Sequence, residues 1–150
     1  MRLIMIASLL AACATNANPN VTTPDVHRTT PQACTHSSGD NFGADECLVD
    51  ADCGATDVCS CAGNTFEYAH VTRNICVPAN CRSDMDCGAF ACSPTDSDGG
   101  PFYGVQGYFC HTAEDGCARD ADCTRGTQTG YCMYSQDVSH WVCGYTFAAG

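Results

Sequence analysis

Cysteine is the residue type with the clearest chemistry in this chain, which contains 15 of them. A thiol can close a disulfide, bind a metal as a thiolate or carry a covalent modification. Six of the cysteines belong to three copies of one motif, Cys-x-x-Asp-x-Asp-Cys, which begin at Cys47, Cys81 and Cys117. The copies start 34 and then 36 residues apart, which is the period of a small repeated module. We therefore expect three similar units, each with its own set of thiols.

The spacing of the cysteines favours disulfides over zinc. Cysteine makes up about a tenth of the 150 residues, a content typical of disulfide scaffolds. Zinc modules normally provide Cys-x-x-Cys pairs, and this sequence has none. A redox role for Cys59-Ser60-Cys61 is an alternative, but redox motifs usually place two residues between the cysteines. The sequence therefore predicts disulfides, and we expect no metal or other cofactor.

Four cysteines recur in each unit, and the two that remain, Cys34 and one of Cys59 or Cys61, are predicted to bridge to each other. Positions six residues apart are separated by about 9 Å in a helix and about 20 Å in a strand, so the two cysteines of one motif should bond to the later pair. Four cysteines per unit still allow three pairings, which the sequence leaves open. The predicted disulfide cysteines are Cys34, Cys47, Cys53, Cys59, Cys61, Cys76, Cys81, Cys87, Cys92, Cys110, Cys117, Cys123, Cys132 and Cys143.

The two aspartates of each motif have two alternative roles. As Asx turns or caps, they would accept backbone N–H groups of their own loop and fix the direction of the second thiol. As calcium ligands they would be incomplete, because calcium takes six to eight oxygens and the motif lacks the glycine and distal glutamate of an EF-hand. The structural role is preferred, and calcium is the alternative. The aspartates are Asp50, Asp52, Asp84, Asp86, Asp120 and Asp122.

Short strands should position the fourth cysteine of each unit. An apolar or aromatic step leads into it in Asn74-Ile75-Cys76, Tyr108-Phe109-Cys110 and Trp141-Val142-Cys143, which is typical of a strand that closes a hairpin. Turn signals lie between the expected strands of each unit, at 62–64, 98–101 and 135–137. The predicted fold class is small and disulfide-rich, with three tandem cysteine-stapled units, short β-hairpins and little helix. Units of about 30 residues are too small to fold without such staples.

Composition and motifs limit the possible functions. The chain has no lysine, and its six arginines face 17 acidic residues, so it is ill suited to bind nucleic acid. The histidines are scattered, and neither a Gly-x-Ser-x-Gly nor a His-Glu-x-x-His motif occurs. We therefore expect no enzymatic activity. Phe102 and Tyr103, beside the longest loop, are the candidate binding residues for an unknown extracellular protein or glycan.

The N-terminus has the features of an export signal. Arg2 provides a positive charge, and Leu3 to Leu10 is an apolar run too short to span a bilayer. The run ends in Leu10-Ala11-Ala12-Cys13, which resembles the lipobox of bacterial lipoproteins. That resemblance implies a signal peptide at 1–12, a lipid on Cys13 and a membrane contact through that lipid. An ordinary secretory signal is the alternative.

Cysteine arithmetic agrees with lipidation, because setting Cys13 apart leaves 14 thiols, an even number that can close seven disulfides. The residue that follows, Ala14, is not the aspartate of an inner-membrane retention signal in that family. The implied location is the cell envelope, at the outer membrane or cell surface. Residues 13–33, rich in Pro, Thr and Asn, are predicted to be a disordered tether in which His27 and Arg28 are solvated.

The folded region is predicted at 34–150, with repeats at about 34–78, 79–114 and 115–150. Its motif resembles the cysteine-rich modules of the Dickkopf amino-terminal region and of whey-acidic-protein type inhibitors, where a glycine follows the second cysteine. Glycine follows in two units, as Gly54 and Gly88, but unit three has Thr124, and the inhibitor family has eight cysteines per module against four here. We predict a lipid-anchored, non-enzymatic binding or envelope-structural protein. The alternatives are a protease inhibitor and a calcium-dependent adhesion module.

Overall fold

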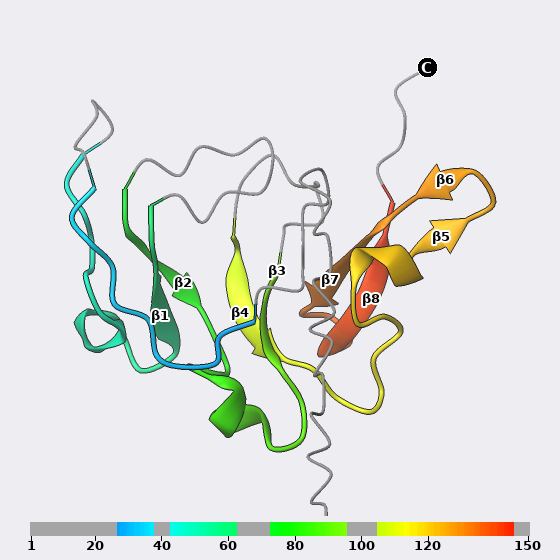
Figure 1. Ribbon diagram of the computed structural model, residues 1–150, viewed down its shortest axis with the longest axis horizontal. Helices are drawn as coiled ribbons and strands as arrows, with labels where there is room; N and C mark the ends of the chain where they lie inside the picture. Colours follow the sequence, from blue (N-terminus) through cyan, green and yellow to red (C-terminus); the bar gives the residue numbers. More distant parts are fainter. Residues whose placement is uncertain (1–26, 38–42, 63–72, 96–104, 146–150) are drawn as a thin grey trace, which may run out of the picture.

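Each cysteine motif is followed by a β-hairpin in the computed structural model, which describes residues 27–37, 43–62, 73–95 and 105–145 (Figure 1). The elements are η1 (Asp50–Asp52), β1 (Asp57–Ser60) and β2 (Ile75–Pro78) in unit one; η2 (Asp84–Cys87), β3 (Cys92–Thr95) and β4 (Gly107–Cys110) in unit two; and η4 (Asp120–Asp122), β5 (Thr124–Arg125), β6 (Gln128–Thr129), β7 (Tyr131–Ser135) and β8 (His140–Gly144) in unit three. In the described segments the helical elements named here are short 3₁₀ turns. The predicted fold class is confirmed.

The hairpins place the third and fourth cysteines of each unit directly opposite one another. Cys59 faces Cys76 across β1 and β2, and the strand pairs β3–β4 and β7–β8 repeat this register. The strands predicted before the fourth cysteine are therefore confirmed in all three units. The predicted turn at 98–101 lies outside the described residues, as does most of the one at 62–64. The turn after Ser135 is present, and the Ser139 N–H donates to the Ser135 carbonyl at 2.8 Å.

Unit three departs from the other two immediately after its motif. The strands β5 and β6 form an additional two-stranded hairpin there, with Gly126 at a φ of 64° in the turn. In unit two, Gly88 directly follows the motif and has a φ of 67°, in a region that side chains rarely adopt. The glycine after the motif is therefore a backbone requirement in unit two, whereas unit three has Thr124 at that position, as the first residue of β5.

Strand β4 joins the three units into one structure. Its alternating side chains face opposite ways, so Tyr108 packs in a core with Val58 and Val77 of unit one, whereas Phe109 packs in a second core with Trp141 of unit three. Figure 1 shows the hairpins side by side, with β4 next to β2 and β3 next to β7. Three small hairpins thus share two cores, which none of them could build alone.

The chain before Cys34 differs from the predicted tether. Residues 27–33 are described, and Ala33 forms a β-bridge with Val49. Arg28 is only 5% exposed, so the expectation that it is solvated is wrong. Residues 13–26 of the predicted tether lie outside the described part. In the described residues, no helix is long and apolar enough to cross a membrane.

Candidate functional site

The disulfides follow one rule in all three units: the first cysteine bonds to the third, and the second bonds to the fourth. The prediction that the two motif cysteines do not bond to each other is confirmed, and the extra cysteine Cys34 bonds to Cys61 rather than to Cys59. The six remaining pairs are Cys47–Cys59, Cys53–Cys76, Cys81–Cys92, Cys87–Cys110, Cys117–Cys132 and Cys123–Cys143.

Close packing of sulfur atoms in each unit resembles a metal centre at first sight. Three sulfurs per unit lie within 4.8 Å of one another, as for Cys47, Cys53 and Cys76 in unit one. Zinc is bound by thiolates, however, and every one of these sulfurs is already in a disulfide. The sulfur clusters are therefore crossing points of two disulfides.

The second aspartate of each motif closes the motif loop on itself. The Oδ2 atom of Asp52 accepts the backbone N–H groups of Leu48 and Val49 at 2.7 and 3.0 Å. Asp86 accepts from the equivalent two residues at 2.7 and 3.0 Å, and Asp122 does so at 2.9 and 3.1 Å. The same carboxylate cap is therefore present in all three units, with the last aspartate of the motif reaching back to N–H groups three and four residues earlier, as in a capping box.

The first aspartate ties the motif to the hairpin. Asp50 accepts the N–H of Cys59 at 3.0 Å, Asp84 that of Cys92 at 2.8 Å, and Asp120 that of Cys132 at 2.7 Å. In each case the donor is the third cysteine, which also bonds to the first cysteine of the motif. One carboxylate and one disulfide thus hold the same strand. Because these carboxylate oxygens accept hydrogen bonds from backbone N–H groups, the geometry favours the structural role of the aspartates over calcium binding.

These hydrogen bonds stabilise the ionised carboxylates. Backbone N–H donors lower the pKa of Asp52, Asp86 and Asp122 below its usual value. Asp45 shows the largest effect, because the N–H of Asn74 and the hydroxyl and N–H of Ser37 lower its pKa to about 2. A folded-state pKa below the unfolded value of about 3.9 contributes stability above that pH.

We therefore expect the urea midpoint of the protein to fall as the pH is lowered from about 5 to about 2, since the folded carboxylates must then be protonated. Asp45→Asn removes the charge that Asn74 and Ser37 solvate, so this variant should be less stable at pH 5 and show a shallower fall. Asp137→Asn, in the exposed turn after β7, is the matched control and should follow the wild type. A midpoint independent of pH over this range would contradict the assignment.

The segment His27-Arg28 is a clasp between units one and two. The guanidinium Nη2 of Arg28 donates to both oxygens of Asp50, at 2.8 and 2.9 Å, and the guanidinium lies 4.7 Å from the ring centroid of Tyr108. The backbone N–H of Arg28 donates to the carbonyl of Cys92, and His27 Nδ1 lies 2.6 Å from Asp84 Oδ2. Sequence reasoning missed this clasp, because the polar composition around His27 and Arg28 is that of a solvated tether.

A second junction joins units two and three around Trp141, whose side chain has no exposure. Its Nε1 donates to the Cys110 carbonyl at 3.2 Å, and its ring stacks on His111 at 4.3 Å. His111 Nδ1 in turn lies 2.7 Å from Asp115, which also accepts two hydrogen bonds from Thr112. The His–Asp pair is therefore part of the packing of this junction.

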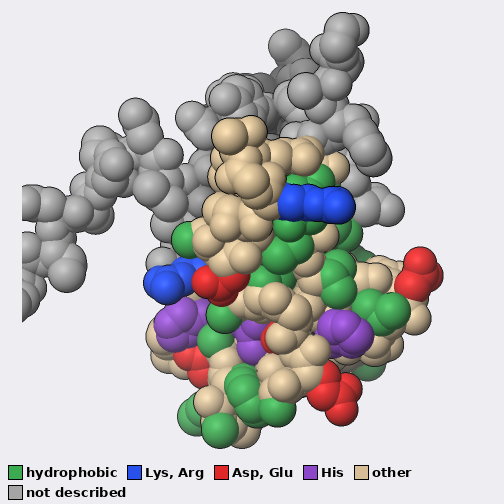
Figure 2. All heavy atoms as spheres, turned by 90° about the vertical axis from the view of Figure 1, so that its right-hand side faces the viewer, with side chains coloured by type: hydrophobic (Ala, Val, Ile, Leu, Met, Phe, Trp, Pro, Cys, Tyr) green, Lys and Arg blue, Asp and Glu red, His purple; other side chains and the backbone are tan. Residues whose placement is uncertain are grey.

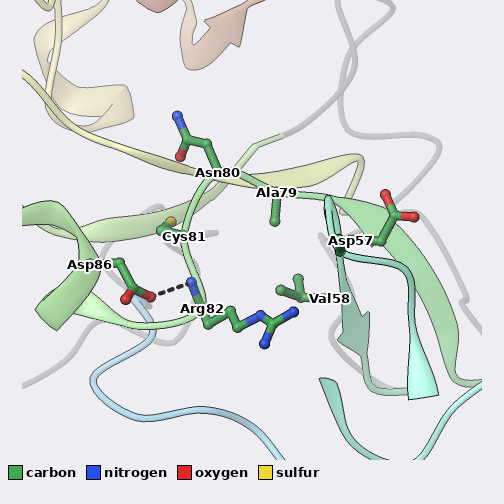
Figure 3. A pocket seen from close by; sticks show the side chains of 8 residues that line it. Asp57, Val58, Ala79, Asn80, Cys81, Arg82 and Asp86 are labelled. Atoms are coloured by element: carbon green, nitrogen blue, oxygen red, sulfur yellow. Dashed lines mark hydrogen bonds between the residues drawn. The ribbon is translucent and has the colours of Figure 1, made fainter. Parts of the chain in front are cut away.

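A hollow between units one and two offers little room for a ligand. Its volume is about 250 Å³, below the usual 300–1,000 Å³ of small-molecule sites. Figure 3 shows Asp86 directed at the backbone N–H of Arg82, while the Arg82 side chain extends away from it toward Val58. Of the two carboxylates that line this pocket, Asp57 and Asp86, the second is thus occupied by its own loop.

Exposed side chains give a more informative picture of the surface. Met85, between the two aspartates of motif two, is 84% exposed, at a position where the other motifs have alanine. In the described part of the face in Figure 2, hydrophobic, acidic, basic and histidine side chains are intermingled.

The predicted binding residues Phe102 and Tyr103, and the predicted lipidation site Cys13, lie outside the described residues.

No protein-family model, curated protein or solved structure matches the chain. The cysteines, the aspartates and the distances between them are therefore the basis for proposing a function.

Proposed function

We propose that this protein is a lipid-anchored extracytoplasmic protein whose three disulfide-stapled units serve a non-enzymatic binding or envelope-structural role. The observation that carries the proposal is the use of cysteine. Seven disulfides pair 14 of the 15 cysteines, and the cysteine that remains is Cys13. One cysteine left over in a disulfide protein requires an explanation, and the sequence before Cys13 supplies one.

The disulfides support a location outside the cytoplasm. Structural disulfides form and persist in oxidising compartments, and thiols are kept reduced in the cytosol. The apolar run before Cys13 fits export, and the Leu-Ala-Ala-Cys sequence fits attachment of a lipid to the thiol. With more than one acyl chain on Cys13, membrane attachment would be stable. We propose the outer membrane or cell surface as the destination, because Ala14 is not an aspartate.

A non-enzymatic role is supported by what the charged residues do. The motif aspartates, Arg28 and the His111–Asp115 pair all hold the fold together. The proposed partner is an extracellular protein or glycan, which would meet surfaces such as the exposed Met85.

The anchor is tested by Cys13→Ser in the full-length protein, produced in a bacterium with lipoprotein processing. Wild type should partition into the detergent phase of Triton X-114 and carry acyl chains by intact mass, and the variant should carry none. Separation of inner and outer membranes on a density gradient tests the destination. The control is far-UV circular dichroism, which should be the same for both proteins. A wild-type protein without acyl chains would disprove lipidation at Cys13.

A further inference from the structure

Unit one contains a line of sulfur atoms that the other two units lack. The Sγ atom of Cys34 lies 3.6 Å from the Sγ of Cys59, although the two belong to different disulfides. Cys59 is bonded to Cys47, whose sulfur lies within 4.8 Å of those of Cys53 and Cys76. The three disulfides of unit one therefore lie next to one another in space, with Cys47–Cys59 between Cys34–Cys61 and Cys53–Cys76.

Burial separates the middle disulfide of this line from the two at its ends. Cys59 has no exposure and Cys47 is 3% exposed, so a reagent in solution does not reach the middle disulfide directly. Cys34–Cys61 and Cys53–Cys76, at the two ends of the line, are both half-buried. Access to the middle disulfide therefore leads through one of these two outer disulfides, and Cys34–Cys61 is the one with a sulfur 3.6 Å from that of Cys59.

Backbone hydrogen bonds hold the two contacting sulfurs in place. The N–H of Cys34 donates to the Leu48 carbonyl at 2.7 Å, beside the bridge between Ala33 and Val49. The N–H of Cys59 donates to Asp50 at 3.0 Å. Opening the outer disulfide leaves these bonds intact, so the sulfur of Cys34 would stay next to that of Cys59.

We propose that unit one is a thiol–disulfide exchange site for an external dithiol, with Cys34–Cys61 as the reactive disulfide and Cys47–Cys59 as its internal acceptor. A thiolate of the dithiol attacks Cys61, forming a mixed disulfide and releasing Cys34 as a thiolate. The second thiol of the partner then displaces Cys61, so the partner leaves as a disulfide. Two electrons pass from the dithiol to the protein, and the two protons of the dithiol end on thiols of the protein.

The internal step is an isomerisation without net oxidation or reduction. The Cys34 thiolate attacks the sulfur of Cys59, the Cys34–Cys59 bond forms, the Cys47–Cys59 bond breaks, and Cys47 leaves as the thiolate. The reduced form of unit one then carries its thiols on Cys61 and Cys47. Because Cys47 is close to Cys53 and Cys76, the thiol can pass one disulfide further.

Two full-length variants test the internal step, since each removes the same disulfide and leaves one thiol. Cys61→Ser leaves Cys34, which contacts Cys59, and Cys34→Ser leaves Cys61. After acid quenching, alkylation in denaturant and peptide mapping by mass spectrometry should find a substantial share of the thiol in Cys61→Ser on Cys47, Cys53 or Cys76. In Cys34→Ser it should remain on Cys61. A thiol wholly on Cys34 in the first variant, or the same distribution in both, overturns the proposal.

The wild-type protein provides an independent test that needs no variant. Treatment with substoichiometric dithiothreitol, followed by the same trapping, should label cysteines of unit one at least several-fold more than those of units two and three, with Cys61 and Cys47 foremost. Equal labelling of the three units, or preferential labelling of unit two or three, overturns the proposal. Peptide mapping reads each cysteine separately, so a thiol on an unlipidated Cys13 is counted apart from the thiols of unit one.

Discussion

Replacing Arg28 by methionine is expected to lower the free energy of unfolding by about 3 kcal/mol, the low end of the cost of breaking a buried ion pair. Methionine keeps much of the apolar stem but leaves the carboxylate of Asp50, itself buried, without its charged partner. The contact with the Tyr108 ring is lost as well. Urea unfolding with the disulfides intact, followed by the fluorescence of Trp141, measures the change.

The chain supplies a matched control in Arg73→Met. Arg73 forms an ion pair with Glu46 at 3.0 Å in which both side chains are about two-fifths exposed, and such surface pairs contribute about 0–1 kcal/mol. The double variant Arg28→Met with Asp50→Asn should recover part of the loss, because no unpaired buried charge remains. If Arg28→Met costs no more than Arg73→Met, the clasp does not contribute to stability as described.

Trp141→Ala is expected to cost about 3–5 kcal/mol, the usual range for removing a buried tryptophan. The side chain fills the core between units two and three and contacts Phe109, Tyr134 and His111. Since this is the sole tryptophan of the chain, unfolding has to be followed by far-UV circular dichroism.

Two further variants separate the components of this effect. Trp141→Phe keeps an aromatic ring but loses the hydrogen bond from Nε1 to the Cys110 carbonyl, so it should cost less than the alanine variant by at least 1 kcal/mol. Val138→Ala, at a half-exposed position in the turn before β8, should change stability by less than about 0.5 kcal/mol. Equal costs for the alanine variants at 141 and 138 would contradict the proposed core.

The part of the fold that could be predicted from the sequence is the local structure within each repeat. The spacing of Cys-x-x-Asp-x-Asp-Cys, and the apolar step before the fourth cysteine, predict local structure, because a turn and a short hairpin depend on neighbouring residues. The aspartate caps of Asp52, Asp86 and Asp122 are local in the same sense, since donor and acceptor lie within four residues. Such features follow from the chemistry of single residues and their spacing.

The parts that could not be predicted depend on contacts distant in sequence. Arg28 reaches Asp50 across 22 residues, and the tether composition around it gave no sign of burial. The division of Tyr108 and Phe109 between two cores depends on how the hairpins pack and not on any one of them. The choice of Cys61 over Cys59 as the partner of Cys34 likewise depends on which thiol the folded unit brings next to Cys34, because residues two apart in a strand share a face and Cys61 lies just after β1.

The most direct test of the account is the intact mass of the detergent-extracted wild-type protein, alkylated once without reduction and once after reduction in denaturant. We predict a chain that begins at Cys13, carries acyl chains, gains no alkyl group before reduction and gains 14 after it. That result would establish that every thiol except the lipidated one is in a disulfide. An unlipidated chain, or alkylation of thiols without reduction, would contradict the central claim.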